Sequence, residues 1–468
     1  MLFNSLQFLF FLPLVLAAYY ALPFRYRWIL IFFASCFFYM AFVPRYILIL
    51  FVIILIDYVS GLAMERTADR PKKMWLLFSL SSNILLLCFF KYFGFINHNA
   101  ELISSWMGFQ FKPLHLDIIL PIGLSFHTFQ SMSYTIEVYR GRQKAERHLG
   151  YFANYVLFFP QMVAGPIERY ETLGNELRSE KKINYLNLSN GFKLVLFGLM
   201  VKMCIADNAA PFVNQVYEKP LEFSSMEVLA AVFLFSFQIY ADFFGYSTIA
   251  LGCALMLGIR IMDNFKTPYL SRSITEFWTR WHISLSTWFR DYLYIPLGGN
   301  KVKLPRWSLN IMIVFMVSGL WHGANWTFVI WGALHGLLRV LEHWFNKLTG
   351  FKMKEGWGLL NVFLALKTFV LTSLIWVFFR ATNFKNAADI FRAIKNNWSY
   401  QTASISFYPA FFFVLLLIAF DLWHYNSRFE LRLNRLAWPL RWSIYSVLLF
   451  CLMALAGTQK FTFIYFQF

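Results

Sequence analysis

Two histidines lie in strongly apolar, aromatic surroundings and are the first candidates for chemistry. His322 belongs to SGLWHGANWTFVIWGALHG (residues 318–336), and His282 belongs to SITEFWTRWHISLSTWFRDYLYIPLGGN (residues 273–300). Burial disfavours the charged imidazolium, so a histidine in this setting stays neutral. A neutral imidazole can take a proton from a hydroxyl group and so act as a general base. From these residues alone, both histidines are also compatible with a structural role in the protein core.

Polar residues interrupt two other apolar stretches. Gln238, Asp242 and Tyr246 follow one another at intervals of four, which places them on one face of a helix. An acidic residue in an apolar span indicates a functional site, but a carboxylate that pairs with an arginine to hold helices together has the same signature. His127 lies inside PIGLSFHTFQSMSY, where it could line a tunnel or serve packing. Gln238, Asp242 and His127 are therefore candidate site-lining residues.

The segments around the two histidines carry local structural signals. Ser273 followed by Glu276 is a capping signal for a helix start. The aromatic residues that follow favour a helix lying at the membrane interface, with His282 on its apolar stripe and pointing into the protein. Near His322, Gly319 belongs to a pair of glycines four residues apart, a spacing that lets neighbouring backbones approach closely. The sequence therefore predicts that His322 lies in a tight seam between helices.

The composition indicates a polytopic membrane protein. Of the 468 residues, 59% are hydrophobic and 14% are charged, whereas soluble domains carry about a quarter charged residues. The net charge of +18 does not indicate nucleic-acid binding, because the basic residues fall in short runs between apolar segments, as the positive-inside rule describes. The five cysteines show no paired spacing and are interpreted as buried thiols, and no Cys/His cluster predicts a metal site.

Apolar runs of about 17–25 residues mark candidate membrane spans. The candidates are Leu6–Leu22, Trp28–Phe42, Tyr46–Met64, Met74–Phe93, Asp117–Tyr139, Leu188–Ile205, Met226–Phe244, Trp307–Leu320, Trp326–Val340, Leu359–Phe379, Ile405–Trp423 and Trp442–Ala456. The apolar stretch 151–166 is interrupted by asparagine, proline and glycine, so it is expected to re-enter the membrane rather than cross it. The predicted fold class is all-α, a single integral membrane domain over residues 1–468 with about 11–13 transmembrane or re-entrant helices.

The motifs resemble those of the membrane-bound O-acyltransferase superfamily, in particular its bacterial branch that acts in alginate O-acetylation and in D-alanyl transfer to teichoic acids. The matching stretches are SFHTFQSMSYTIEVYRG, FFPQMVAGPIERY and the two histidine-containing segments. The resemblance implies a helical bundle with a buried central site and a family core over about residues 117–345. It places His322 at the family's central histidine, the general base, and His282 at its second site, which orients donor or acceptor. No role is carried over to His127.

The resemblance also implies the activity. We expect an O-acyltransferase that moves an acetyl group from a cytoplasmic thioester, acetyl-CoA or an acyl carrier protein, to an exopolysaccharide or envelope glycan of the alginate type. The thioester is a co-substrate, and no tightly bound cofactor is expected. Transfer would be direct or would pass through an extracytoplasmic hydrolase-like partner, from a multi-pass protein of the bacterial cytoplasmic (inner) membrane. Asn325 and the backbone from Trp321 to Ala324 are candidate stabilisers of the oxyanion.

A transporter that moves acyl groups or glycan without acyl-transfer chemistry is the competing hypothesis. Polar residues between Phe235 and Gly336 would then line a path. Transport does not need the pair His282 and His322, so this pair favours the enzyme.

Overall fold

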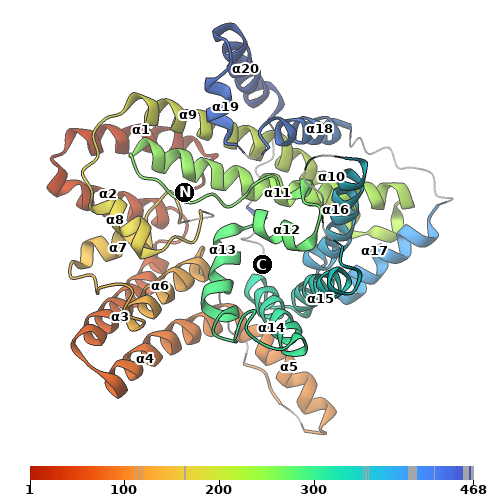
Figure 1. Ribbon diagram of the computed structural model, residues 1–468, viewed down its shortest axis with the longest axis horizontal. Coiled ribbons are helices and arrows are strands. Elements are labelled where there is room, and N and C mark those ends of the chain that lie inside the picture. The colour runs from red at the N-terminus through yellow and green to blue at the C-terminus, as the bar shows by residue number, and fades with distance from the viewer. Residues whose placement is uncertain are drawn as a thin grey trace. The chain divides into compact units, whose positions relative to one another are not determined.

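The computed structural model describes the chain except residues 110, 115, 117, 119, 163, 164, 352, 354, 355, 357, 399–407, 426, 457–462 and 465–468. Every regular element within the described part is a helix (Figure 1). The chain divides into two compact units. The first comprises Met1–Phe192 and Ala250–Met262, and the second comprises Lys193–Ile249 and Asp263–Phe468.

The helices of the first unit are α1 (Leu6–Ala21), α2 (Phe24–Met40), η1 (Pro44–Tyr46), α3 (Ile47–Arg66), α4 (Asp69–Leu87), η2 (Cys88–Tyr92), α5 (Phe93–Trp106), α6 (Leu124–Tyr139), α7 (Leu149–Leu157), η3 (Tyr170–Gly174), α8 (Asn175–Arg178) and the start of α9 (Tyr185–Met200). The second unit holds the end of α9, η4 (Val201–Ala206), α10 (Asp207–Glu218), η5 (Pro220–Glu222), most of α11 (Ser225–Met256), η6 (Pro268–Leu270), α12 (Ile274–Arg280), α13 (Ile283–Phe289), η7 (Arg290–Tyr294), α14 (Leu304–His322), α15 (Trp326–Thr349), α16 (Leu359–Arg380), α17 (Phe384–Asn396), α18 (Tyr408–Trp423), α19 (Phe429–Asn434), α20 (Trp438–Phe450) and η8 (Cys451–Leu455).

Most of the predicted spans coincide with apolar helices. The helices long and apolar enough to cross a membrane within the described residues are Pro44–Arg66, Arg70–Trp106, Tyr185–Glu218, Ser225–Met256, Leu304–His322 and Leu359–Arg380. Shorter apolar helices occupy Leu6–Ala21, Ala410–Trp423 and Trp438–Ala454. Helices α2, α6 and α15 account for the other three predicted spans. The protein is therefore a polytopic all-α membrane protein.

One predicted span starts later than hydropathy indicates, and one apolar stretch contains only a short helix. The span predicted from Asp117 begins only at Leu124 in α6, because Gly123 before it adopts the left-handed conformation (φ 73°), and residues 117 and 119 lie outside the described part. Helix α7 has nine residues and is thus about 13 Å long, too short for a hydrocarbon core of about 30 Å. This length agrees with the prediction that the stretch 151–166 does not cross the membrane.

A buried carboxylate joins α3, α4 and α6, which pack side by side in the first unit (Figure 1). Asp57 is fully buried. Its Oδ1 accepts a hydrogen bond from Ser79 Oγ (2.6 Å), its Oδ2 accepts one from Asn83 Nδ2 (2.9 Å), and Ser131 Oγ donates to Oδ2 as well. Sequence analysis did not single out Asp57. Because the donors come from α4 and α6, the carboxylate on α3 links the three helices by hydrogen bonds.

We expect Asp57→Ala to lower the free energy of unfolding by about 2–4 kcal/mol, because three buried donors lose their acceptor. Asp57→Asn should cost less, since the amide oxygen still accepts. The measurement is the temperature at which detergent-solubilised protein loses its monodisperse size-exclusion peak. Ser60→Ala is the matched control, because Ser60 lies on α3, is fully buried, and its Oγ has no hydrogen-bond partner in the part of the chain that the structure describes. Equal losses for Asp57→Ala and Ser60→Ala would refute the assigned role.

Candidate active site

His322 is the last residue of α14 and is enclosed by aromatic rings. Its ring centroid lies 4.9 Å from that of Trp321, 5.0 Å from Trp331 and 5.4 Å from Phe379. Only 4% of His322 is exposed. Helix α14 ends here because Gly323 is extended (φ −156°, ψ 147°). The imidazole therefore occupies the turn between two helices, in surroundings that hold little water.

Glycines bring α14 and α15 close enough to form this enclosure. A Cβ added to Gly332 would collide with the carbonyl oxygen of Phe315, and one added to Gly319 would collide with that of Phe328. The close approach of backbones that was predicted at Gly319 is thus confirmed. It places Trp331 of α15 against His322 of α14.

His282 occupies a break between two short helices rather than a place on one interface helix. The expected helix over residues 273–300 starts as predicted, with Ser273 Oγ accepting from Glu276 N (3.0 Å), but α12 ends at Arg280 and α13 begins at Ile283. His282 itself is left-handed (φ 43°, ψ 55°). Such a conformation is costly for a non-glycine residue and persists only where its surroundings hold it. The prediction of a single helix was therefore wrong.

Asn264 holds this break in place. Its side-chain Oδ1 accepts from Ser284 Oγ (2.6 Å) and its backbone carbonyl accepts from Ile283 N (3.0 Å). On the other side, Asn264 Nδ2 donates to Ser247 Oγ of α11 (3.2 Å). Sequence analysis missed Asn264, because an asparagine in a loop carries no signal for a partner 20 residues away. Asn264 is a positioning residue for His282.

The two histidines meet in the second unit. Their ring centroids are 6.3 Å apart, and Trp321 lies 6.2 Å from His282 as well as against His322. His282 is fully buried and packs edge-on against Phe243 of α11 (4.6 Å). Burial lowers the pKa of His282 to about 3, so the ring is neutral at physiological pH. Two imidazoles at this separation can act on the same substrate group.

The lowered pKa of His282 predicts a pH dependence of stability. An exposed histidine titrates near 6.5, so below that pH the unfolded state binds a proton that the folded state excludes. The free energy of unfolding therefore falls with pH from about 6.5 downward, by up to about 2 kcal/mol at pH 5. Thermal midpoints of wild type and His282→Gln at pH 7.5, 6.5 and 5.5 test this. The wild type should show the steeper decline, and parallel curves would contradict the assignment.

Asp242 is the centre of a buried ion cluster. Lys202 Nζ lies 2.8 Å from Asp242 Oδ1 and 2.6 Å from Asp207 Oδ1. Asp242 Oδ2 accepts from the backbone N–H of Ile464 (2.7 Å), and the Lys202 ammonium lies 5.8 Å from the Tyr246 ring. The cation is a lysine rather than the arginine considered from the sequence. Asp242 and Tyr246 share a helix face as predicted, and the ion cluster gives that face a structural explanation.

The remaining candidates occupy different settings. Gln238 is buried on α11. His127 belongs to the first unit, where its Nδ1 lies 2.9 Å from the Val156 carbonyl oxygen. Asn325 caps α15, since its Oδ1 accepts from Thr327 N (3.1 Å), and its Nδ2 donates to the Thr382 carbonyl (2.9 Å). Roles for Gln238 and His127 as lining residues, and for Asn325 in oxyanion stabilisation, stay predictions.

Among the described residues, no group of three His, Cys, Asp or Glu side chains is placed to hold a metal ion.

A helical membrane protein with two neighbouring buried histidines has the features of an enzyme that performs acid–base chemistry away from water. The chain belongs to MBOAT, the membrane-bound O-acyltransferase family, whose model matches residues 142–379. It is therefore a membrane O-acyltransferase.

Three relatives that are named for acyl transfer match this chain, two of them over most of its length. The probable alginate O-acetylase AlgI of Pseudomonas syringae pv. tomato is 38% identical over 412 residues, which is 87% of this chain and 77% of that protein. The peptidoglycan O-acetyltransferase of Helicobacter pylori is 35% identical over 84% of this chain and 80% of its own length. The teichoic acid D-alanyltransferase of Streptococcus thermophilus is 32% identical over 48% of this chain and 58% of its own length.

Proposed function

We propose that this protein transfers an acetyl group from a cytoplasmic thioester to a hydroxyl group of an exopolysaccharide or cell-envelope glycan of the alginate type. The O-acetylases among the relatives support acetyl as the transferred group, because their similarity extends over more than four fifths of the chain. The relatives are named for different acceptors, namely alginate, peptidoglycan and teichoic acid. These names support a glycan acceptor in general and favour no particular glycan. The setting proposed for the reaction is the bacterial cytoplasmic membrane.

The neighbouring buried histidines are the observation that carries the proposed mechanism. His322 takes the proton of the acceptor hydroxyl. The alkoxide oxygen bonds to the thioester carbonyl carbon, the carbon–sulfur bond breaks, and the proton passes to the departing thiolate. His282 orients one of the two substrates. Exclusion of water limits hydrolysis of the activated donor.

The donor is proposed as a co-substrate, acetyl-CoA or an acetylated carrier protein, with no tightly bound cofactor. The acceptor is either the glycan itself or an extracytoplasmic hydrolase-like partner that completes the transfer. Both routes use the same first step at His322. They differ in whether an acylated partner accumulates when glycan is withheld.

The test is base-labile acetate released from purified envelope polysaccharide. Cells that lack the protein and cells that carry it should differ, with acetate present only in the second. Equal acetate in both would refute the proposal. Acetyl or glycan movement across the membrane without ester formation would favour a transporter instead.

A further inference from the structure

Backbone strain in the second unit is concentrated at two residues. Among the described residues other than glycine, only Thr267 (φ 44°) and His282 (φ 43°) have a positive φ. The left-handed conformation is costly for both, and more so for Thr267, which is β-branched and precedes Pro268. Such strain concentrates at functional sites and persists only where the surrounding structure holds it. The proposed mechanism uses His282 and gives no role to Thr267.

Backbone hydrogen bonds join the two segments that carry the strained residues. The N–H of Lys266 donates to the carbonyl of Arg280 (3.0 Å), and the N–H of Ile283 donates to the carbonyl of Asn264 (3.0 Å). Each bond lies next to a strained residue, so the conformation of one segment depends on that of the other. We call these two paired segments the clasp, which comprises residues 264–267 and 280–283.

The Arg280 side chain connects the clasp to its surroundings. Its Nη1 donates to the Lys266 carbonyl oxygen (3.1 Å) and to Thr267 Oγ1 (3.3 Å). Its Nη2 donates to the hydroxyl of Tyr425, just after α18 (2.9 Å), and its Nε donates to Glu276 Oε1 on α12 (3.2 Å). The side chains of Arg280 and Glu276 are each only 13% exposed. A planar guanidinium has donors in fixed directions, so Arg280 can hold all these partners at once.

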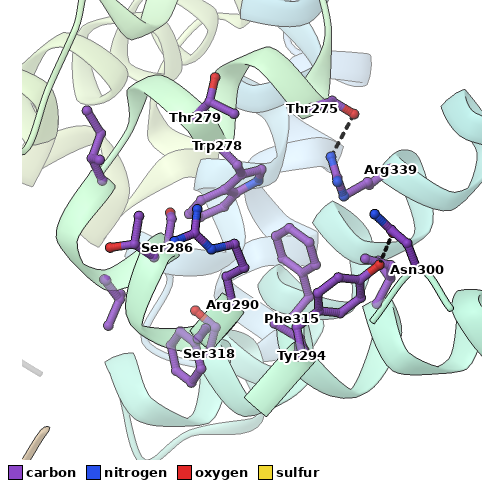
Figure 2. Close-up of a pocket in the computed structure, with 16 residues that line it drawn as sticks. Thr275, Trp278, Thr279, Ser286, Arg290, Tyr294, Asn300, Phe315, Ser318 and Arg339 are labelled. Carbon is purple, nitrogen blue, oxygen red and sulfur yellow. Dashed lines mark hydrogen bonds between the residues drawn. The ribbon is translucent and has the colours of Figure 1, made fainter. Parts of the chain in front are cut away.

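The clasp also shapes the wall of a cavity next to His282. Thr279 and Ile283, which lie on either side of the break, line a cavity of about 450 Å³, and Figure 2 shows Thr279 at its edge. Within the described part of the chain, the residues that line this cavity do not include Arg280. Arg280 therefore acts on this wall and on His282 through the backbone of the clasp, and not by contact with a ligand in the cavity.

We propose that Arg280 is a positioning residue for His282. Its guanidinium keeps the loop at Thr267 in its strained shape, and the loop holds the break through the two backbone hydrogen bonds. The break in turn fixes the left-handed His282 with its ring 6.3 Å from that of His322. Without Arg280, the loop relaxes and His282 loses the support that keeps its ring at this position. This inference rests on the proposed function, because His282 orients a substrate there.

A double-mutant cycle between Arg280→Gln and His282→Gln tests this coupling. Ester formation by full-length protein in lipid nanodiscs is measured from acetyl-CoA and purified envelope polysaccharide, and each substrate is varied in turn. Arg280→Gln should lower the turnover about tenfold or more, because a displaced catalytic group is costly. It should cause no further loss when His282→Gln is already present.

The pattern of kinetic constants separates positioning from a general structural defect. The two single variants should change the same constants, whether kcat or the KM of one substrate. A structural defect lowers the amount of active protein, so it lowers kcat, leaves both KM values unchanged and multiplies with the loss in His282→Gln. Multiplicative losses, or different constants changed in the two variants, would overturn the proposal.

Amide hydrogen exchange tests the clasp without turnover. Arg280→Gln should speed exchange in peptides that cover Lys266 and Ile283 by at least about tenfold, because local opening becomes easier. Arg272→Gln is the matched control, because Arg272 pairs with Oε2 of Glu276 (3.2 Å) while Arg280 pairs with Oε1 of the same carboxylate (3.0 Å). Unchanged exchange in Arg280→Gln, or equal acceleration in both variants, would overturn the proposal.

Arg280→Lys protects the test from a folding defect in Arg280→Gln. The lysine keeps the charge beside Glu276 but cannot donate in several fixed directions. We expect wild-type levels of folded protein and a turnover lowered about three- to tenfold, the effect of about one lost hydrogen bond. A variant with wild-type turnover and wild-type exchange would show that the guanidinium does not hold the clasp.

These outcomes stay separate from those of the proposed function. A His282→Gln protein with wild-type kinetics refutes the role of His282, and Arg280 then has no catalytic group to position. Unchanged exchange in Arg280→Gln, together with an impaired His282→Gln, refutes the clasp and leaves the proposed function standing. A wild-type protein that forms no ester from acetyl-CoA refutes that donor, whereas the exchange measurement still decides whether Arg280 holds the break.

Discussion

His322→Ala is expected to lower the rate of ester formation at least about a hundredfold, the usual contribution of a positioned general base. The acceptor hydroxyl loses the group that removes its proton. The ring of His282 lies 6.3 Å from that of His322 and does not take its place among Trp321, Trp331 and Phe379. The measurement is acetate ester formed by purified protein under conditions of a single turnover. Membrane levels should match those of the wild type.

A matched control separates catalysis from packing. His335 is fully buried on α15 and packs against Trp278 and Trp331, and neither of its ring nitrogens has a hydrogen-bond partner among the described residues. His335→Ala removes the same volume from the same aromatic layer, so any loss due to packing should appear in both variants. Similar losses in the two variants, or wild-type rates in His322→Ala, would refute the role of His322 as the base.

Local patterns in the sequence predicted much of the helical scaffold. Apolar runs located the membrane helices, and glycine spacing located the close contact of α14 with α15, because both depend on neighbouring residues in the chain. Ser273 was identified as a helix cap for the same reason. The His322 enclosure was predicted only in part, since Trp331 is nearby in sequence while Phe379 comes from α16, 57 residues later, and has no local signal.

Features that depend on tertiary contacts could not be predicted from the sequence. The helical pattern across residues 273–300 continues through His282, so it predicted one helix. The break is stabilised by Asn264, whose bonds to Ser284 and Ile283 can offset a strained residue that local propensity would not choose. Pairing of Asp242 with an arginine was one of two interpretations that the sequence left open, whereas the fold brings Lys202 from η4. Sequence analysis did not single out Asp57 inside the predicted span Tyr46–Met64, and its donors come from two neighbouring helices that give no local signal.

Lys202→Met is expected to cause the largest loss of stability, about 3–5 kcal/mol, because it leaves two buried carboxylates without their cation. Lys202 is 1% exposed, and Asp207 and Asp242 are 4% and 3% exposed at their side chains. Methionine keeps most of the volume, so the change tests charge rather than packing. Thermal loss of the monodisperse peak in detergent measures it. Lys193→Met is the matched control, because Lys193 lies on α9, is more exposed and donates to Asn434.

The cluster adjoins the active site along α11. Asp242 directly precedes Phe243, whose ring contacts His282 at 4.6 Å. Adding Asp207→Asn and Asp242→Asn to Lys202→Met removes the uncompensated charge, so the triple variant should recover a large part of the lost stability. If charge balance also fixes the α11 face behind His282, ester formation should recover in parallel. A Lys202→Met protein as stable as the wild type, or a triple variant no better than the single one, would show that the cluster does not act through charge balance.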